Sequence, residues 1–268
     1  PTPAFFPAIE RAYTHSIPKP IAIVVCYPAN PTAYVASLDS YRDLVQFAKK
    51  HDIIILSDLA YAEVYFDDAS PPPSVLQIPG AMDCTVEFTS MSKTFSMAGW
   101  RMGFAVGNER LLAALARVKS YLDYGAYTPI QVAATAALNG PDDCIKDMRA
   151  TYKRRRDVLV ESFGNAGWKF SPPEASMFAW VPIPEPYKSI GSLEFSKMLV
   201  EKADVAVAPR SRMLIQAAND ELPVKRHRAS RRIGRVAARP PRNHPPRTRA
   251  SRPRRRTPAP ARPRPGRP

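Results

Sequence analysis

The sequence contains few cysteines, few histidines and no long apolar run. Its three cysteines, Cys26, Cys84 and Cys144, lie far apart and form no CxxC pair. This excludes a disulfide framework, and we expect free, mostly buried thiols and a cytoplasmic location. The four histidines show no metal-ligand spacing, so no metal site is predicted. A membrane-spanning helix needs about 18 consecutive apolar residues, and the sequence has no such run, so we expect no membrane association.

Acidic and aromatic residues are scarce at one end of the chain. Residues 210–268 hold 19 of the 39 Lys and Arg residues, 2 of the 24 Asp and Glu residues, and no Phe, Tyr or Trp. The whole chain carries a net charge of +15, yet residues 1–209 have 20 basic and 22 acidic side chains. The overall charge therefore does not make the body of the protein a nucleic-acid binder.

Residues 1–209 have the pattern of an α/β protein. Short β-branched or apolar runs at 21–27, 53–56, 84–90 and 102–106 predict buried strands. Helical spacing of apolar residues at 37–51, with Ser37 or Asp39 as the cap, separates the first two runs. Strands without polar alternation are typical of a mostly parallel sheet that helices cover on both faces.

The later part of the chain has a different pattern. After Asn108, helical spacing continues to about residue 138, with an interruption near Gly125 and Pro129, and a second helix is predicted over 142–166. Strands are predicted at 168–170, 177–183 and 204–209, with a helix at 192–203. We interpret 1–140 as a large domain, 141–209 as a partial α+β small domain and 210–268 as a disordered tail.

Polar side chains follow three successive predicted strands. Asn30 follows the first, Asp58 and Tyr61 the second, and Ser90 and Lys93 the third, with Arg101 eight residues beyond Lys93. Asp58 follows an aliphatic strand, so we expect a buried carboxylate with a cationic partner there. Taken singly, each of these residues has a simpler explanation, such as a turn, an ion pair, packing or a solvated surface. Parallel strands bring their carboxyl ends to one edge, however, where ligands bind in such sheets.

These six residues together supply the groups that pyridoxal phosphate requires. The lysine amine can form a Schiff base and move a proton, and the carboxylate can keep the pyridine nitrogen protonated. The phenol and the amide can donate to the ring oxygen O3′, and a serine with an arginine can hold the phosphate. The sequence therefore predicts a cofactor site at this edge.

Three segments resemble one known family, the class I/II aminotransferases of pyridoxal-phosphate fold type I. They are YPANPT at 27–32, SDLAYAEV at 57–64 and FTSMSKTFSMAGWRMGFAVG at 88–107. The residues of these segments are most similar to the alanine and LL-diaminopimelate aminotransferase branch of the family. The resemblance covers residues 1–209. It implies that Lys93 binds the cofactor covalently, Asp58 pairs with the pyridine nitrogen, Tyr61 and Asn30 contact O3′, and Ser90 and Arg101 hold the phosphate.

The resemblance also implies a reaction and an assembly. Members of the family exchange an amino group between an amino acid and a 2-oxo acid, and they are cytosolic homodimers. Another reaction of the same cofactor, a β-lyase or a decarboxylase reaction, is the first alternative. An inactive chain that binds nucleic acid through its basic tail is the second.

The chain departs from the family pattern at three places. Ala33 stands where many relatives have glycine, and only 29 residues precede Asn30, where the family has a much longer segment. The pattern stops after Pro209, before the arginine that binds the substrate carboxylate in the family. We therefore expect a chain that is incomplete at both ends and of low activity.

The tail has two interpretations. An arginine-rich segment can bind nucleic acid electrostatically and, without aromatic rings for stacking, non-specifically. Alternatively, the single lysine against 18 arginines in residues 210–268 indicates a frameshift near codon 210 of a GC-rich gene. The nucleotide sequence distinguishes the two interpretations.

Overall fold

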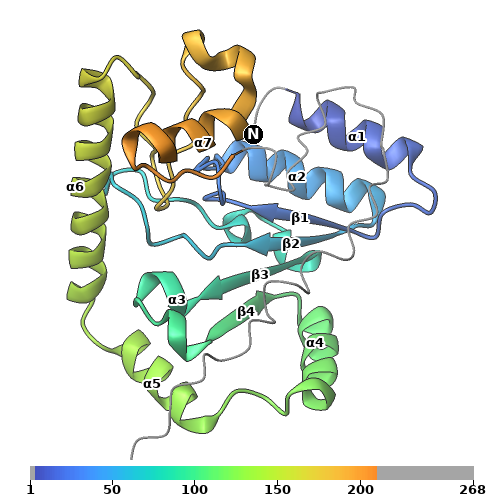
Figure 1. The fold of residues 1–268 in the computed structure, drawn as a ribbon. Helices are drawn as coiled ribbons and strands as arrows, with labels where there is room; N and C mark the ends of the chain where they lie inside the picture. Colours follow the sequence, from blue (N-terminus) through green and yellow to red (C-terminus); the bar gives the residue numbers. More distant parts are fainter. Residues whose placement is uncertain (1–3, 210–268) are drawn as a thin grey trace, which may run out of the picture. The chain divides into compact units, whose positions relative to one another are not determined.

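A four-stranded, mostly parallel sheet forms the centre of the fold. The computed structural model describes residues 4–209, so the predictions about residues 210–268 lie outside the described residues. The strands are β1 (Ala22–Cys26), β2 (Ile54–Asp58), β3 (Thr85–Ser90) and β4 (Gly103–Gly107), in the spatial order β1-β2-β3-β4 (Figure 1). All four lie within about two residues of the predicted positions.

The sheet contains one antiparallel strand. The pairs β1–β2 and β2–β3 are parallel, whereas β4 runs antiparallel to β3 with Ser90 opposite Gly103. The connection between β3 and β4 holds only the four-residue helix α3 (Met91–Thr94) and a short 3-10 turn (Ala98–Trp100). A parallel return needs a longer crossover, so the chain doubles back instead.

Helices flank the sheet on more than one side. Helices α1 (Phe5–His15) and α2 (Leu38–His51) lie beside β1 and β2, and α4 (Glu109–Leu122) lies beside β4 (Figure 1). The Ser37 hydroxyl accepts a hydrogen bond from the backbone N–H of Ser40, so Ser37 caps α2 as the sequence predicts. The predicted class, an α/β protein with a mostly parallel sheet and flanking helices, is confirmed.

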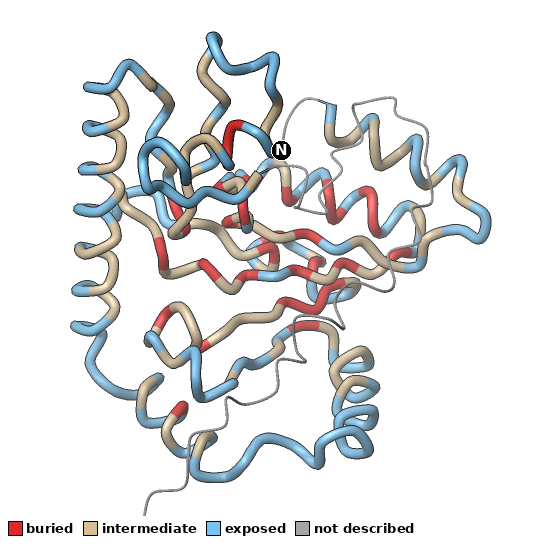
Figure 2. Tube along the Cα trace, viewed as in Figure 1, coloured by how far each residue is buried: buried red, intermediate tan, exposed pale blue. Residues whose placement is uncertain are grey.

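The main core lies between α2 and one face of the sheet, where buried residues are concentrated (Figure 2). From α2 it takes residues that have helical spacing, and from β1 and β2 it takes Val25 and Ile55. Its fully or nearly fully buried members are Val25, Ala36, Tyr41, Leu44, Val45, Ala48, Ile55, Val75, Ile78 and Ala81.

Three further helices follow the sheet, and they begin and end close to where the sequence predicts. They are α5 (Thr128–Asn139), α6 (Asp143–Asn165) and α7 (Gly191–Ala203). Gly125 interrupts the pattern with a φ of 91°, and Pro129 stands in the first turn of α5. Among the described residues, none of the helices combines the length and apolar composition that a membrane crossing needs.

The strands predicted at 168–170, 177–183 and 204–209 are wrong. Within the described part of the chain, residues 108–209 form no strand, and the one β-type contact there is an isolated bridge between Tyr65 and Ala175. A strand needs a neighbouring strand for its hydrogen bonds, and these segments find none among residues 4–209. Of the three segments, only 168–170 joins an aromatic cluster, in which Trp168 and Phe170 pack with Phe163 of α6, Phe195 of α7 and Tyr187.

Candidate active site

The carboxyl ends of the parallel strands bring the predicted residues to one edge of the sheet. Strand β1 ends at Cys26, β2 at Asp58 and β3 at Ser90. Cys26 lies opposite Asp58, and Asp58 lies opposite Phe88. The segments that follow these three strand ends carry Asn30, Tyr61 and, on helix α3, Lys93, which places all of them beside the same edge.

Tyr61 is the centre of a chain of contacts at this edge. Its side chain is buried, and its hydroxyl accepts a hydrogen bond of 3.5 Å from the Asn30 Nδ2 amide. The Lys93 Nζ amine lies 5.6 Å from the centre of the Tyr61 ring, within cation–π range. Burial raises the pKa of the Tyr61 phenol above its ordinary value, so the phenol is a neutral donor near neutral pH.

Asp58 is more accessible than the sequence predicts. We expected a buried carboxylate with a cationic partner, but the residue is exposed, and Oδ1 accepts a hydrogen bond of 3.1 Å from the Ala60 backbone N–H. It lies at the last position of β2, where the strand leaves the core, and an exposed carboxylate does not need the cationic partner that burial would require. The neighbouring Cys26 thiol has a raised pKa, chiefly because of burial and further because of the Asp58 charge.

Ser90 joins β3 to the helix that carries Lys93. Its hydroxyl accepts a hydrogen bond of 3.2 Å from the Ser92 N–H, so it acts as the N-cap of α3. Lys93 is the third residue of this helix and is half-buried. Thr94, the next residue, is buried.

Arg101 lies near Ser90 along the backbone but does not point its donors there. Ser90 pairs with Gly103, and the Met91 N–H donates to the Met102 carbonyl at 3.1 Å. The Arg101 guanidinium, however, is exposed and donates to the carbonyl of Ala98 at 3.0 Å. The structure therefore brings Asn30, Tyr61 and Lys93 into contact and leaves the Arg101 side chain outside this group.

Two residues beside the site were not predicted from the sequence. The Phe178 ring packs edge-on against Tyr61, with 5.5 Å between the ring centres. Nothing in the sequence near Phe178 indicates this contact, because 117 residues separate it from Tyr61. The second is Glu87, a buried carboxylate in the middle of β3. A charged residue inside an otherwise uncharged predicted strand was the available signal for Glu87.

The three cysteines are free thiols, but not all of them are buried as predicted. Cys26 and Cys84 are partly buried, whereas Cys144 is exposed. Cys144 lies at the second position of α6, on a helix that contains no buried residue.

Comparisons with known proteins identify relatives along the body of the chain. A family model described as "Aminotransferase class I and II" matches residues 4–225. The putative aminotransferase AatC of Rhizobium meliloti is 73% identical over 209 residues, which is 78% of this chain and 51% of AatC. The glutamate-pyruvate aminotransferase AlaC of Escherichia coli is 50% identical, over 76% of this chain and 50% of AlaC.

Relatives with lower sequence identity are also aminotransferases or have a similar fold. An LL-diaminopimelate aminotransferase of Moorella thermoacetica is 40% identical over 72% of this chain and 50% of its own length. The solved structure of BacF from Bacillus subtilis superimposes with a TM-score of 0.66 and 36% identity, over 71% of this chain and 48% of BacF. The chain thus spans about half the length of the curated relatives that it matches.

The family model covers all three sequence motifs. The curated relatives favour the alanine and LL-diaminopimelate aminotransferase branch, which the residues of those motifs also indicate. The fold agrees independently, since the mostly parallel sheet superimposes on a solved relative. The chain therefore belongs to the class I and II aminotransferases.

Proposed function

We propose that this chain carries part of the active centre of a pyridoxal-phosphate-dependent aminotransferase that exchanges an amino group between an amino acid and a 2-oxo acid. The observation that supports this most is the contact of Asn30, Tyr61 and Lys93 at the carboxyl edge of the sheet. When bound, the cofactor would supply an electron sink for the carbanion that forms at the substrate Cα.

Lys93 would bind the cofactor and move the proton. Its amine lies 5.6 Å from the Tyr61 ring centre and forms no ion pair within residues 4–209, so no carboxylate in this part of the chain holds it away from a Schiff base or from a proton that it would move. The Tyr61 hydroxyl accepts from Asn30, which leaves its own proton free to donate to the cofactor's ring oxygen.

Asp58, Ser90 and Arg101 would hold the other groups of the cofactor. The Asp58 carboxylate uses one oxygen for the Ala60 N–H, so its second oxygen can accept from the pyridine nitrogen. The Ser90 hydroxyl accepts from Ser92 and can still donate to a phosphate. Arg101 must turn away from the Ala98 carbonyl before it can contribute its planar fork of donors.

Several finer features belong to the same proposal. The likeness to the glutamate-pyruvate aminotransferase AlaC supports glutamate and pyruvate as substrates. The separate core around α2 and the aromatic cluster of α6 and α7 support a division into 1–140 and 141–209. Exposed Tyr121, Tyr124 and Tyr127 support a homodimer, and free thiols support a cytoplasmic location.

The cofactor assignment is tested by covalent trapping. The recombinant chain is mixed with pyridoxal phosphate, reduced with borohydride and digested, and the modified lysine is located by mass spectrometry. We expect the label on Lys93 and a visible absorbance band before reduction. In Lys93→Ala both are lost, because no other predicted ligand provides an amine at this edge.

Lys119→Ala is the matched control. Lys119 is also a helical lysine, but on α4, where it pairs with Asp123 at 2.7 Å. This variant is expected to trap the cofactor like the parent chain. Label that persists at another lysine in Lys93→Ala would overturn the assignment. Product analysis with glutamate and pyruvate then separates transamination from release of ammonia or carbon dioxide.

A further inference from the structure

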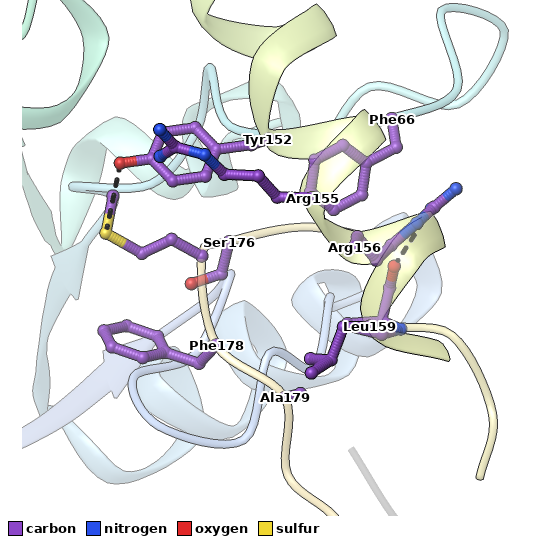
Figure 3. A pocket seen from close by; sticks show the side chains of 10 residues that line it. Phe66, Tyr152, Arg155, Arg156, Leu159, Ser176, Phe178 and Ala179 are labelled. Carbon is purple, nitrogen blue, oxygen red and sulfur yellow. Dashed lines mark hydrogen bonds between the residues drawn. The ribbon is translucent and has the colours of Figure 1, made fainter. Parts of the chain in front are cut away.

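A cavity is lined by Phe178, the residue whose ring packs against Tyr61 of the candidate active site. Its volume is about 150 Å³, and it lies between α6, the loop after β2 and the segment 173–179 (Figure 3). Its lining residues that matter here are Phe66, Tyr152, Arg155, Leu159, Ser176 and Phe178. None of the predicted cofactor residues lines it.

Ser176 lines this cavity and has a buried hydroxyl that is unpaired among the described residues. The residue is 1% exposed, and its Oγ finds no hydrogen-bond partner among the described residues. The backbone is held in place by the Ser176 N–H, which donates to the Val64 carbonyl at 2.6 Å, and by the adjacent bridge between Tyr65 and Ala175. A buried hydroxyl without an acceptor is destabilising, so an acceptor at this position would be favourable.

Two arginines line the cavity, and they differ in their partners. Arg156 pairs with Asp157 at 2.6 Å, donates to the Pro173 carbonyl at 3.2 Å and stacks on Phe66 at 4.6 Å. Arg155 makes no ion pair or hydrogen bond within residues 4–209, and its guanidinium lies 5.7 Å from the Tyr152 ring centre. Arg155 therefore has a full set of donors free for an anion.

The remaining walls are apolar. Phe66, Leu159 and Phe178 surround the space in Figure 3. The Tyr152 hydroxyl has only the Met177 Sδ atom as a partner, at 3.9 Å, and sulfur is a weak acceptor. The cavity thus has a cationic fork, apolar sides and two hydroxyls, those of Ser176 and Tyr152.

From these groups we propose that this cavity is an accessory site for a short-chain oxo carboxylate. The carboxylate pairs with Arg155, the carbon chain packs against Phe66 and Phe178, and the oxo oxygen accepts from the Ser176 hydroxyl. Because Phe178 also packs against Tyr61 at 5.5 Å, an occupant of this site touches the same ring that borders the candidate active site. The proposal goes beyond the proposed transamination and does not require bound cofactor.

The test is a titration of the full chain with two probes, 2-oxobutyrate and butyrate. Ligand-observed NMR measures the affinity of each probe. The two probes differ at the oxo group, so they isolate the role of Ser176. We expect 2-oxobutyrate to bind more tightly than butyrate, and Ser176→Ala to remove this difference. Arg155→Gln is expected to weaken both probes about tenfold or more, because a charge-assisted pair is lost.

Arg154→Gln is the matched control. Arg154 and Arg155 are both exposed, but only Arg155 lines the cavity. Arg154→Gln makes the same charge change one residue away, and it should leave both affinities unchanged. Circular dichroism confirms that each variant is folded. Equal weakening by Arg154→Gln and Arg155→Gln, or no binding to the parent chain, would overturn the proposal.

The Lys93→Ala variant separates this site from the proposed active site. Retained binding of 2-oxobutyrate in Lys93→Ala supports a separate site, whatever the outcome of the cofactor trapping. Loss of binding in that variant means that the probe occupied the cofactor edge, and the accessory site is then refuted.

Discussion

Replacing Glu87 with alanine is expected to destabilise the fold by about 2 to 3 kcal/mol. Glu87 is 7% exposed, yet no cation pairs with it among residues 4–209. Its carboxylate instead accepts three hydrogen bonds: from the Ser57 hydroxyl at 3.0 Å, the Ser74 hydroxyl at 2.6 Å and the Val75 N–H at 3.2 Å. It therefore ties β2, β3 and the loop around Ser74 together.

The size of the destabilisation depends on which of the three hydrogen-bond donors can find a new acceptor after Glu87 is truncated. A hydrogen bond to a charged group contributes about 1.5 to 3 kcal/mol, and a neutral one about 1 kcal/mol. Glu87 lines a cavity of about 510 Å³, so water can enter and satisfy the two rotatable hydroxyls after truncation. The N–H of Val75, a fully buried residue, cannot turn toward that water, and removal of the buried charge recovers part of its desolvation cost.

Urea unfolding followed by circular dichroism measures the change, with the cofactor absent so that ligand linkage does not contribute. Glu87→Gln keeps the size and one acceptor oxygen, and it should cost about 1 kcal/mol. Glu63→Ala is the control, because Glu63 lines the same cavity but makes no hydrogen bond within the described residues, and it should cost less than about 0.5 kcal/mol. A cost for Glu87→Ala as small as that of the control would refute the three-way link.

Two further changes test other parts of the fold. Gly103→Ala should destabilise by about 1 to 3 kcal/mol, because a Cβ there would lie 2.6 Å from the Thr89 carbonyl oxygen. Gly99→Ala is its control and should be tolerated, since a Cβ at Gly99 meets nothing within 4 Å; equal thermal shifts would contradict the model of crowding. Tyr41→Phe should be neutral or stabilising at pH 7, because the buried Tyr41 hydroxyl has no hydrogen-bond partner among the described residues. Burial, and then the Glu87 charge, raise the Tyr41 pKa. The protonated phenol is therefore favoured by the folded state. Its contribution to the free energy of unfolding is fully present below the unfolded pKa of about 10 and is lost progressively as the pH rises above that value. Thermal unfolding at pH 7 and about pH 10.5 should show a smaller alkaline loss in Tyr41→Phe, and an unchanged loss would count against this assignment.

Much of the sheet could be predicted because its signals are local. The apolar runs that became β1 and β2 and the helical spacing of Tyr41, Leu44 and Val45 depend on residues close in sequence. The gathering of Asn30, Tyr61 and Lys93 also followed from the sequence, because parallel strands end at one edge. The roles of these side chains toward a cofactor remain predictions.

The sequence by itself determined the four strands of the sheet, the helices that begin after Ser37, the motif-bearing edge and the family. Only the tertiary structure decided that other apolar segments form no strand, since 177–183 and 204–209 have the composition of strands but no neighbouring strand within residues 4–209. It also decided that Asp58 is exposed, that Arg101 turns toward Ala98, and that Phe178 reaches Tyr61. These outcomes depend on contacts between residues distant in sequence, and on solvent access at the end of a strand, which local patterns do not encode.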